Sequence, residues 1–372
     1  MSSAQAPADS VLIRNIGALV SGDVHAPIVD ASSIYIANGL IAAIGSERSA
    51  QQTVDAASGL VAPGLWDADH HTYFGDHTPQ LEARGYLEAT LRAGTTSVIA
   101  AGLCDLPGRP RDGQGTKQLA ILAARSWRYD RPRNIKVHAG TVIAEPGLRE
   151  ADFGDLARAG VNRLSFMSEV PSIREAQRYV EWAHANGMAV MAHCAGAKLI
   201  EEACSVEHAL RAIKPDVACQ VNGGPRPPPD EVVDWLFDET RCALGLTLMG
   251  GLKAARRVIR KAADRDELDR VVIGTDTPSG AGVIPGGVQR TVQLLTTVSG
   301  VQPETALAFA TGNTSRAFGL PGGRIEVGQP ADLIVAHPAD GSLGGSGDGL
   351  DGLARGEWLA ITNIVVDGHL EV

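Results

Sequence analysis

Four side chains that could bind a metal ion or exchange protons stand where apolar runs of this sequence end. They are two histidines and two aspartates: Asp69, His71, His193 and Asp276. Imidazole nitrogens and carboxylate oxygens suit Zn²⁺, Fe²⁺ or Mn²⁺. A catalytic metal held by about three protein ligands keeps one position open for a water, which then loses a proton near neutral pH and attacks a carbonyl carbon. These residue types therefore predict a site for metal-assisted hydrolysis, provided that the fold brings them together.

Taken singly, each of these residues has an ordinary structural interpretation. A histidine at the end of a strand is more often a hydrogen-bonded core or surface residue, and a Gly-Thr-Asp tripeptide is common in loops. The prediction depends on the position of all four residues, since side chains at the carboxyl ends of the strands of a parallel α/β barrel meet at one mouth.

The middle of the chain has the rhythm of such a barrel. Strand-like runs and helical patterns alternate from about residue 65, with eight β-then-α steps in roughly 250 residues, which is typical of a (β/α)8 TIM-type barrel. The expected helices include 116–127, 172–186, 199–213, 230–237 and 302–318. A doubly wound open sheet competes with this prediction, but it would need a glycine-rich phosphate turn after its first strand, and residues 67–71 contain no glycine.

Both ends of the chain are β-rich and too short to bury a core alone. The Asn38-Gly39 pair between two strand-like runs is a hairpin signal. We expect residues 1–62 and 320–372 to pair as one small accessory β-sandwich domain beside a catalytic barrel formed by residues 63–319.

Composition limits the possible partners. The 372 residues carry a net charge of −10, which opposes binding to nucleic acid. No apolar run approaches the roughly 18–20 residues that cross a bilayer. Five scattered cysteines without C-x-x-C spacing, and a beginning without the pattern of a secretion signal, predict a cytoplasmic enzyme with reduced thiols. We expect a small-molecule substrate, no organic cofactor and no membrane or nucleic-acid partner, with a homo-oligomer as an open possibility.

Several ordered motifs resemble the amidohydrolase superfamily, and most closely its enamidase-like members. They are the runs 55–67, 106–110, 136–140, 145–148, 222–225, 276–280, 310–314 and 328–333. The resemblance implies a metal-dependent barrel hydrolase that cleaves carbon–nitrogen bonds other than peptide bonds, often in cyclic amides.

The expected metal positions are only partly retained. The family's His-x-His pair reads Asp69-His70-His71 here, the bridging ligand of the fourth strand corresponds to Phe166, and a further histidine is replaced by Gln220. These losses argue against two metals. The retained residues resemble the single-metal arrangement of the adenosine-deaminase branch, with Asp69, His71, His193 and Asp276 as ligands and Asp276 as general base. The extra carboxylate of Asp69 favours Mn²⁺ or Fe²⁺ over Zn²⁺.

Further residues are candidates for contact with the substrate. Gln220 could donate a hydrogen bond to a substrate oxygen, although a filler role in the barrel is an equal alternative. His138, His70 and Asn222 are the other expected contacts, with turn formation competing for Asn222. Arg109 is expected on a surface loop, with binding of a substrate carboxylate as its alternative.

Three functions compete at this point. The first is hydrolysis of a small amide, imide or enamide, with a ring as the expected substrate, by a metal-activated water, with Asp69, His71 and Asp276 as the catalytic residues. The second is metal-independent, non-hydrolytic acid–base chemistry in the same barrel, namely isomerisation, cyclisation, elimination or carbon–carbon cleavage. The third is an inactive barrel kept for binding.

Overall fold

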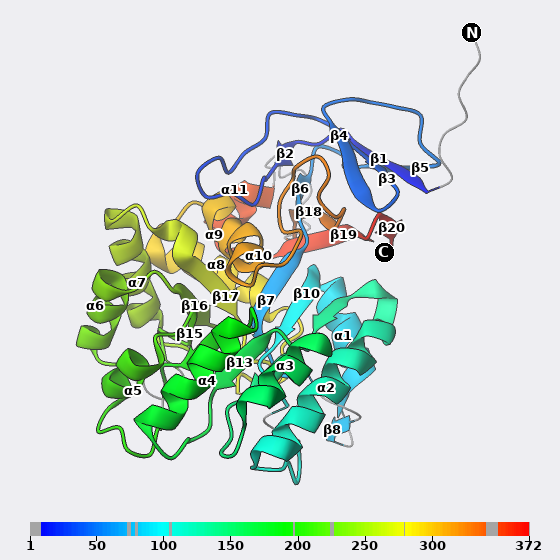
Figure 1. The fold of residues 1–372 in the computed structure, drawn as a ribbon. Coiled ribbons are helices and arrows are strands. Elements are labelled where there is room, and N and C mark those ends of the chain that lie inside the picture. Colours follow the sequence, from blue (N-terminus) through cyan, green and yellow to red (C-terminus); the bar gives the residue numbers. More distant parts are fainter. Residues whose placement is uncertain are drawn as a thin grey trace.

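The computed structural model describes residues 9–72, 76–78, 81–103, 106–195, 198–223, 227–278, 280–339 and 349–371. Helices and strands alternate through the middle of the chain (Figure 1). The barrel strands are β7 (Leu65–His70), β10 (Thr95–Ala100), β11 (Lys136–His138) with β12 (Thr141–Ile143), β13 (Arg163–Phe166), β14 (Ala189–His193), β15 (Val217–Cys219), β16 (Ala243–Thr247) and β17 (Val271–Gly274).

The barrel strands are parallel, and the first and last of them meet. One set runs β11-β10-β7 and the other β12-β13-β14-β15-β16-β17, so the third strand is divided between the two sets. The amide of Asp276 donates to the carbonyl oxygen of Asp69, and that of His71 to the carbonyl oxygen of Thr277, each over 2.8 Å. The backbone of the candidate site thus closes the barrel, and the predicted (β/α)8 fold is confirmed.

Helices surround these strands (Figure 1). They are α1 (Ala83–Arg92), α2 (Gly113–Tyr129), α3 (Glu150–Arg158), α4 (Ile173–Ala185), α5 (Val206–Ile213), α6 (Asp230–Glu239), α7 (Leu252–Asp264) and α8 (Gly287–Ser299). Side-chain caps explain several of their starts. Ser172 accepts a hydrogen bond from the amide of Glu175, and Ser205 accepts one from the amide of His208. Such caps satisfy amides that have no partner within the helix.

Two helix predictions need correction. The expected helix 199–213 begins only at Val206, where Ser205 caps it. The expected helix 302–318 is two helices, α9 (Pro303–Phe309) and α10 (Gly312–Ala317). A Cβ atom on Gly312 would lie 2.1 Å from the carbonyl oxygen of Gly22, so the chain at the break packs closely against the loop that follows residues 18–19. A further short helix, α11 (Gly349–Ala354), lies near the C-terminus.

The accessory β-strands lie together on one side of the barrel (Figure 1). One sheet has the order β4-β3-β1-β5 and the other β2-β6-β18-β19-β20. Their bounds are β1 (Ser10–Arg14), β2 (Ala18–Leu19), β3 (Ile34–Ala37), β4 (Leu40–Ile44), β5 (Gln52–Asp55), β6 (Leu60–Pro63), β18 (Leu333–Pro338), β19 (Leu359–Val366) and β20 (His369–Leu370). A small ribbon of β8 (Asp76–Thr78) and β9 (Leu81–Glu82) precedes α1.

The two ends of the chain meet within one sheet. β6 pairs with β18 in antiparallel register, and buried side chains from both ends, such as Ile13 and Leu333, belong to one apolar cluster. This pairing supports our proposal that residues 1–62 and 320–372 form a single accessory domain. Asn38 and Gly39 have φ angles of 53° and 78° in the turn between β3 and β4, as a tight hairpin requires. None of the helices in the described ranges is long and apolar enough to span a membrane.

Candidate active site

Asp69 and Gln220 meet across the interior of the barrel. Asp69 lies on β7, and Gln220 follows β15, which β16 and β17 separate from β7. The Nε2 atom of Gln220 nevertheless donates to Oδ2 of Asp69 over 3.3 Å, which is possible only through the barrel interior. Both side chains are buried, at 4% and 7% exposure. The Oδ1 atom of Asp69 is also buried and has no hydrogen-bond partner.

His71 and Asp276 form the closest pair of titratable groups in the site. Nε2 of His71 lies 2.7 Å from Oδ1 of Asp276. A Cβ atom on Gly280 would lie 1.8 Å from Oδ2 of Asp276, so only glycine leaves room for the carboxylate in this position. Asp276 and Gln220 have φ angles of 60° and 56°, in the left-handed region. Backbone strain of this kind is concentrated at functional sites.

His193, the last residue of β14, completes the group. It is 6% exposed, and its Nε2 atom is buried without a hydrogen-bond partner. Burial and the neighbouring His71 lower its pKa, while the carboxylates of Asp69 and Asp276 act in the opposite direction. The charges that act on His193 are therefore those of the three residues predicted to share its site.

A network of hydroxyl groups lies next to the four residues. Asp67 accepts hydrogen bonds from the backbone amide and from Oγ1 of Thr275, at 2.9 and 2.5 Å. Oγ1 of Thr275 also lies 2.6 Å from Oγ1 of Thr277. Burial raises the pKa of Asp67 to about 7, against the effect of the bonds from Thr275. The sequence did not reveal this link between Asp67 and Thr275, which directly follows β17.

The donor types of the site fit one divalent cation, although their present arrangement is not that of a complete set of metal ligands. Within the described ranges, no three His, Cys, Asp or Glu side chains are arranged to hold a metal ion. Two of the four donors contact each other, because Nε2 of His71 is engaged with Asp276. The other two, Oδ1 of Asp69 and Nε2 of His193, are buried without partners. Buried polar atoms are nearly always paired, so these two atoms fit a site for a bound group.

The fourth strand supplies no side chain that could bridge two metals. Phe166 is fully buried in the apolar cluster that also holds Leu164 and helix residues such as Tyr179. Because side chains alternate along a strand, Ser165 lies on the opposite face of β13, and its buried Oγ has no partner. Neither a phenyl ring nor a neutral hydroxyl replaces a bridging carboxylate, so β13 supplies no bridging ligand.

Three predicted substrate contacts are not brought together with this group. His70 stacks on Tyr86 of α1 with ring centroids 5.8 Å apart, and its Nδ1 atom contacts Thr72. His138 stacks on Trp66 at 5.2 Å. Asn222 instead clamps the backbone of Thr247, donating to its oxygen and accepting from its amide at 2.9 and 2.8 Å.

Sequence reasoning also missed a buried ion pair among the loops that follow the strands. Arg109 was expected on the surface, but its side chain is 5% exposed and its Nη1 atom lies 2.7 Å from Glu145. Its Nη2 atom donates to Oγ of Ser168 over 3.2 Å. The loops after β10, β12 and β13 supply these three residues, so the pair lies at the same end of the barrel as the candidate site. Of the motifs noted above, Gly224, Pro225 and Ser279 lie outside the described residues.

Comparison with known proteins agrees with this geometry. The profile of the amidohydrolase family matches residues 228–365. The chain is 37% identical to enamidase from Eubacterium barkeri over 368 residues, covering 97% of this chain and 95% of that protein. A crystal structure of enamidase matches with a TM-score of 0.90 at 37% identity, covering 98% and 96% of the two chains. The fold also resembles an amidohydrolase from a Sargasso Sea environmental sample, with a TM-score of 0.68 at 18% identity over 98% and 93% of the chains.

Proposed function

Because the chain belongs to the amidohydrolase family, whose members hydrolyse carbon–nitrogen bonds other than peptide bonds, we propose that its substrate is a small cyclic amide, imide or enamide. The extended match to enamidase supports a ring substrate. The observation that carries the mechanism is the contact of His71 with Asp276 over 2.7 Å, where the barrel closes.

In this proposal Asp276 is the general base. Its carboxylate accepts a proton from the attacking water and returns it to the leaving nitrogen as the carbon–nitrogen bond breaks. The 2.7 Å contact shows that His71 and Asp276 reach the same point of the barrel mouth, and Gly280 leaves the space that the carboxylate needs. Gln220 holds Asp69 with one amide hydrogen, so its second amide hydrogen is available to a substrate oxygen.

The proposal assigns four residues to one divalent cation: Asp69, His71, His193 and Asp276. When bound, such a cation supplies Lewis-acid activation of the water and of the substrate carbonyl. The unpartnered Oδ1 of Asp69 and Nε2 of His193 support this assignment. With two carboxylates in the donor set, we expect Mn²⁺ or Fe²⁺ to be preferred over Zn²⁺.

A second candidate is metal-independent acid–base catalysis of an isomerisation, cyclisation, elimination or carbon–carbon cleavage. It is favoured by the same contact, because Nε2 of His71 is already engaged with Asp276 and the pair alone could move a proton. In this alternative, Asp69 and Gln220 would bind the substrate.

Metal content and turnover, measured on one preparation, separate the two candidates. Freshly purified protein is assayed against a panel of five- and six-membered cyclic amides, imides and enamides before and after exhaustive chelation. The hydrolase proposal expects about one metal per chain, a loss of turnover of at least roughly 100-fold on chelation, and recovery with Mn²⁺ or Fe²⁺. Full turnover in metal-free protein would assign the second candidate, and neither turnover nor thermal stabilisation with any member of the panel would contradict both.

The proposal includes a small-molecule substrate and a cytoplasmic location. Cys194, Cys204, Cys219 and Cys242 are free thiols, as a reducing compartment favours. Assembly into a homo-oligomer stays a prediction.

A further inference from the structure

The third barrel strand is interrupted, and one arginine joins its two halves. β11 ends at His138 and pairs with β10, whereas β12 begins at Thr141 and pairs with β13. Arg163, the first residue of β13, donates from Nη2 to the carbonyl oxygen of His138 over 2.6 Å and from Nε to Oγ1 of Thr141 over 2.9 Å. The guanidinium therefore fills the gap between the two halves.

Among the described residues, no carboxylate forms an ion pair with Arg163. The residue is 1% exposed, its hydrogen-bond acceptors are neutral, and its Nη1 atom is buried without a partner. Burial alone lowers its pKa, to about 10, so the group stays charged at neutral pH. Buried charges are normally paired, because desolvating an unpaired one is costly.

A second arginine stands beside the first around a small cavity. The cavity has a volume of about 190 Å³ and is lined by Ala124, Arg128, Val137, His138, Ala139, Gly140, Gly160, Asn162 and Arg163. Arg128 is exposed and forms no ion pair in the part of the chain that the structure describes. Its Nη2 atom lies 2.8 Å from where a Cβ on Gly160 would be. No carboxylate is among the described lining residues, in a chain whose net charge is −10.

His138 does not add a third charge. Burial and the charges of Arg163, Lys136 and Arg131 lower its pKa to about 3, so its imidazole is neutral at neutral pH. Its Nε2 atom is buried and unpartnered, like Nη1 of Arg163. The cavity thus combines two cationic groups with buried polar atoms that lack partners.

We propose that the cavity between Arg128 and Arg163 binds a small oxyanion of the phosphate or sulfate class. Nη1 of Arg163 exposes almost no surface, so this residue acts mainly through its charge, and the direct hydrogen bonds come from Arg128 and Asn162. The cavity borders the segment before β13, at the amino-terminal ends of the strands and away from Asp276. The bound oxyanion neutralises Arg163 where the third strand is interrupted, and it takes no part in the hydrolysis.

Titration calorimetry with inorganic phosphate at constant ionic strength tests this proposal. We expect saturable binding of one phosphate per chain and a matching rise of the melting temperature. Arg128→Gln should weaken the affinity about tenfold, since it removes charge-assisted hydrogen bonds. Arg125→Gln, which changes another exposed arginine of α2, is the matched control and should bind as the wild type does. Turnover should be unchanged in both variants.

A second ligand and a second variant make the test more specific. Glycerol phosphate in place of inorganic phosphate distinguishes a free oxyanion from the phosphate group of a larger molecule, and we expect inorganic phosphate to bind more tightly because the cavity is small. Arg163→Lys keeps a charge but loses the fork of hydrogen bonds, and Arg128→Gln remains decisive if that variant does not fold. Absence of saturable binding, or equal affinities for Arg128→Gln and Arg125→Gln, would overturn the proposal.

Discussion

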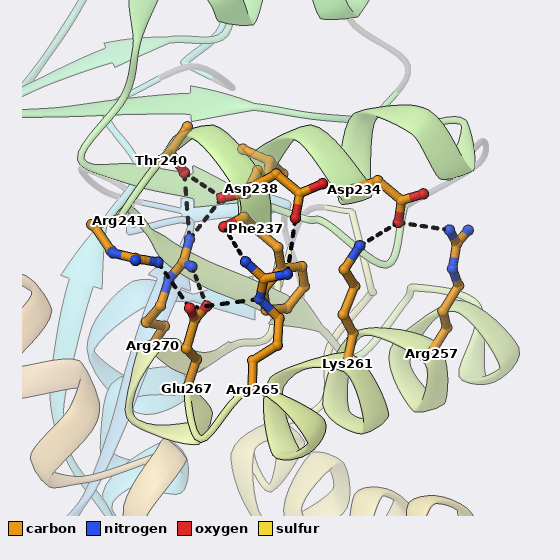
Figure 2. A network of polar contacts seen from close by, with 11 residues as sticks. Asp234, Phe237, Asp238, Thr240, Arg241, Arg257, Lys261, Arg265, Glu267 and Arg270 are labelled. Atoms are coloured by element: carbon orange, nitrogen blue, oxygen red, sulfur yellow. Dashed lines mark hydrogen bonds and ion pairs between the residues drawn. The ribbon is translucent and has the colours of Figure 1, made fainter.

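Two regions of the molecule differ in how their polar groups are paired: the contact between α6 and α7, and the mouth of the barrel. Between α6, α7 and the residues that directly follow each helix, every charged side chain labelled in Figure 2 has an oppositely charged partner. Asp234 binds both Arg257 and Lys261, and Glu267 binds three arginines, of which Arg270 is only 7% exposed. At the mouth, Asp69 and His193 each keep a buried polar atom without a partner.

This difference indicates that the α6–α7 network stabilises the fold, whereas the mouth of the barrel is arranged to bind a ligand. The α6–α7 network surrounds a fully buried ring, since Lys261, Arg265 and Arg270 lie 5.5, 5.9 and 5.2 Å from the centre of Phe237. It fastens two helices, and the charges of its members are balanced within the network. Unpartnered buried atoms are costly to folding, and their presence at the mouth is understandable if a substrate, a water or a cation completes them.

The largest expected effect comes from removing the His71–Asp276 pair at the mouth. His71→Ala and Asp276→Asn should each lower kcat/KM by roughly a thousandfold or more, because both proton transfer and ligand binding are lost. Each variant should unfold at nearly the temperature of the wild type. Activity within tenfold of the wild type in either one would remove that residue from the mechanism.

A smaller change moves Asp276 without altering any proposed ligand. Gly280→Ala places a Cβ atom where the carboxylate now lies, so we expect kcat to fall about 10- to 100-fold through misplacement of the base. Gly251→Ala is the matched control, since a Cβ there meets its nearest neighbour at an ordinary 3.7 Å. Equal activity in the two variants would show that the position of Asp276 does not matter.

Substitutions in the α6–α7 network should change the stability of the protein and leave its activity unchanged. Glu267→Gln removes the carboxylate that Arg241 and Arg270 contact, while Arg265 keeps Asp238, and it should lower the free energy of unfolding by about 3 kcal/mol. Denaturant unfolding measures this loss, and kcat should stay unchanged. Asp264→Asn, an exposed position at the end of α7, serves as the control. A drop in kcat without loss of stability would contradict the division between the two regions.

The smallest expected effect concerns acid stability at Asp152. Burial raises the pKa of this carboxyl, but hydrogen bonds from Lys117 and the amide of Arg149 outweigh burial and hold it at about 2. An aspartate in the unfolded chain ionises near its usual value of about 3.9. The ionised group therefore contributes about 2 kcal/mol above pH 4, and this contribution is lost as the pH falls from about 4 to about 2.

Asp152→Asn should remove this part of the acid dependence. Unfolding free energies of wild type and variant, measured by denaturant titration across this range, should differ at pH 5 and converge toward pH 2. A constant difference at every pH would contradict the assignment.

The barrel was predictable from the sequence because its signals are local. Runs such as 189–193 are continuously apolar up to their last residue, as buried parallel strands are, and cap residues such as Ser172 mark where helices begin. The break between α9 and α10 was not predictable, because it depends on contact between Gly312 and the distant Gly22.

The site was predictable only in part, for the same reason. Position along the strands predicted that His71, His193 and Asp276 share a site, but spacing could not show that His70 lies against Tyr86. Burial of Arg109 depends on Glu145, 36 residues further along the chain, which no local pattern links to it. The orientation of His70 and the burial of Arg109 depend on contacts between distant segments, which a single sequence does not reveal.

Anomalous X-ray scattering from a crystal soaked in Mn²⁺ tests the central claim most directly. We expect one manganese peak per chain, within bonding distance of His193 and Asp69 and with His71 released from Asp276. A site without a peak, with the His71–Asp276 contact intact in protein that still turns over its substrate, would contradict it.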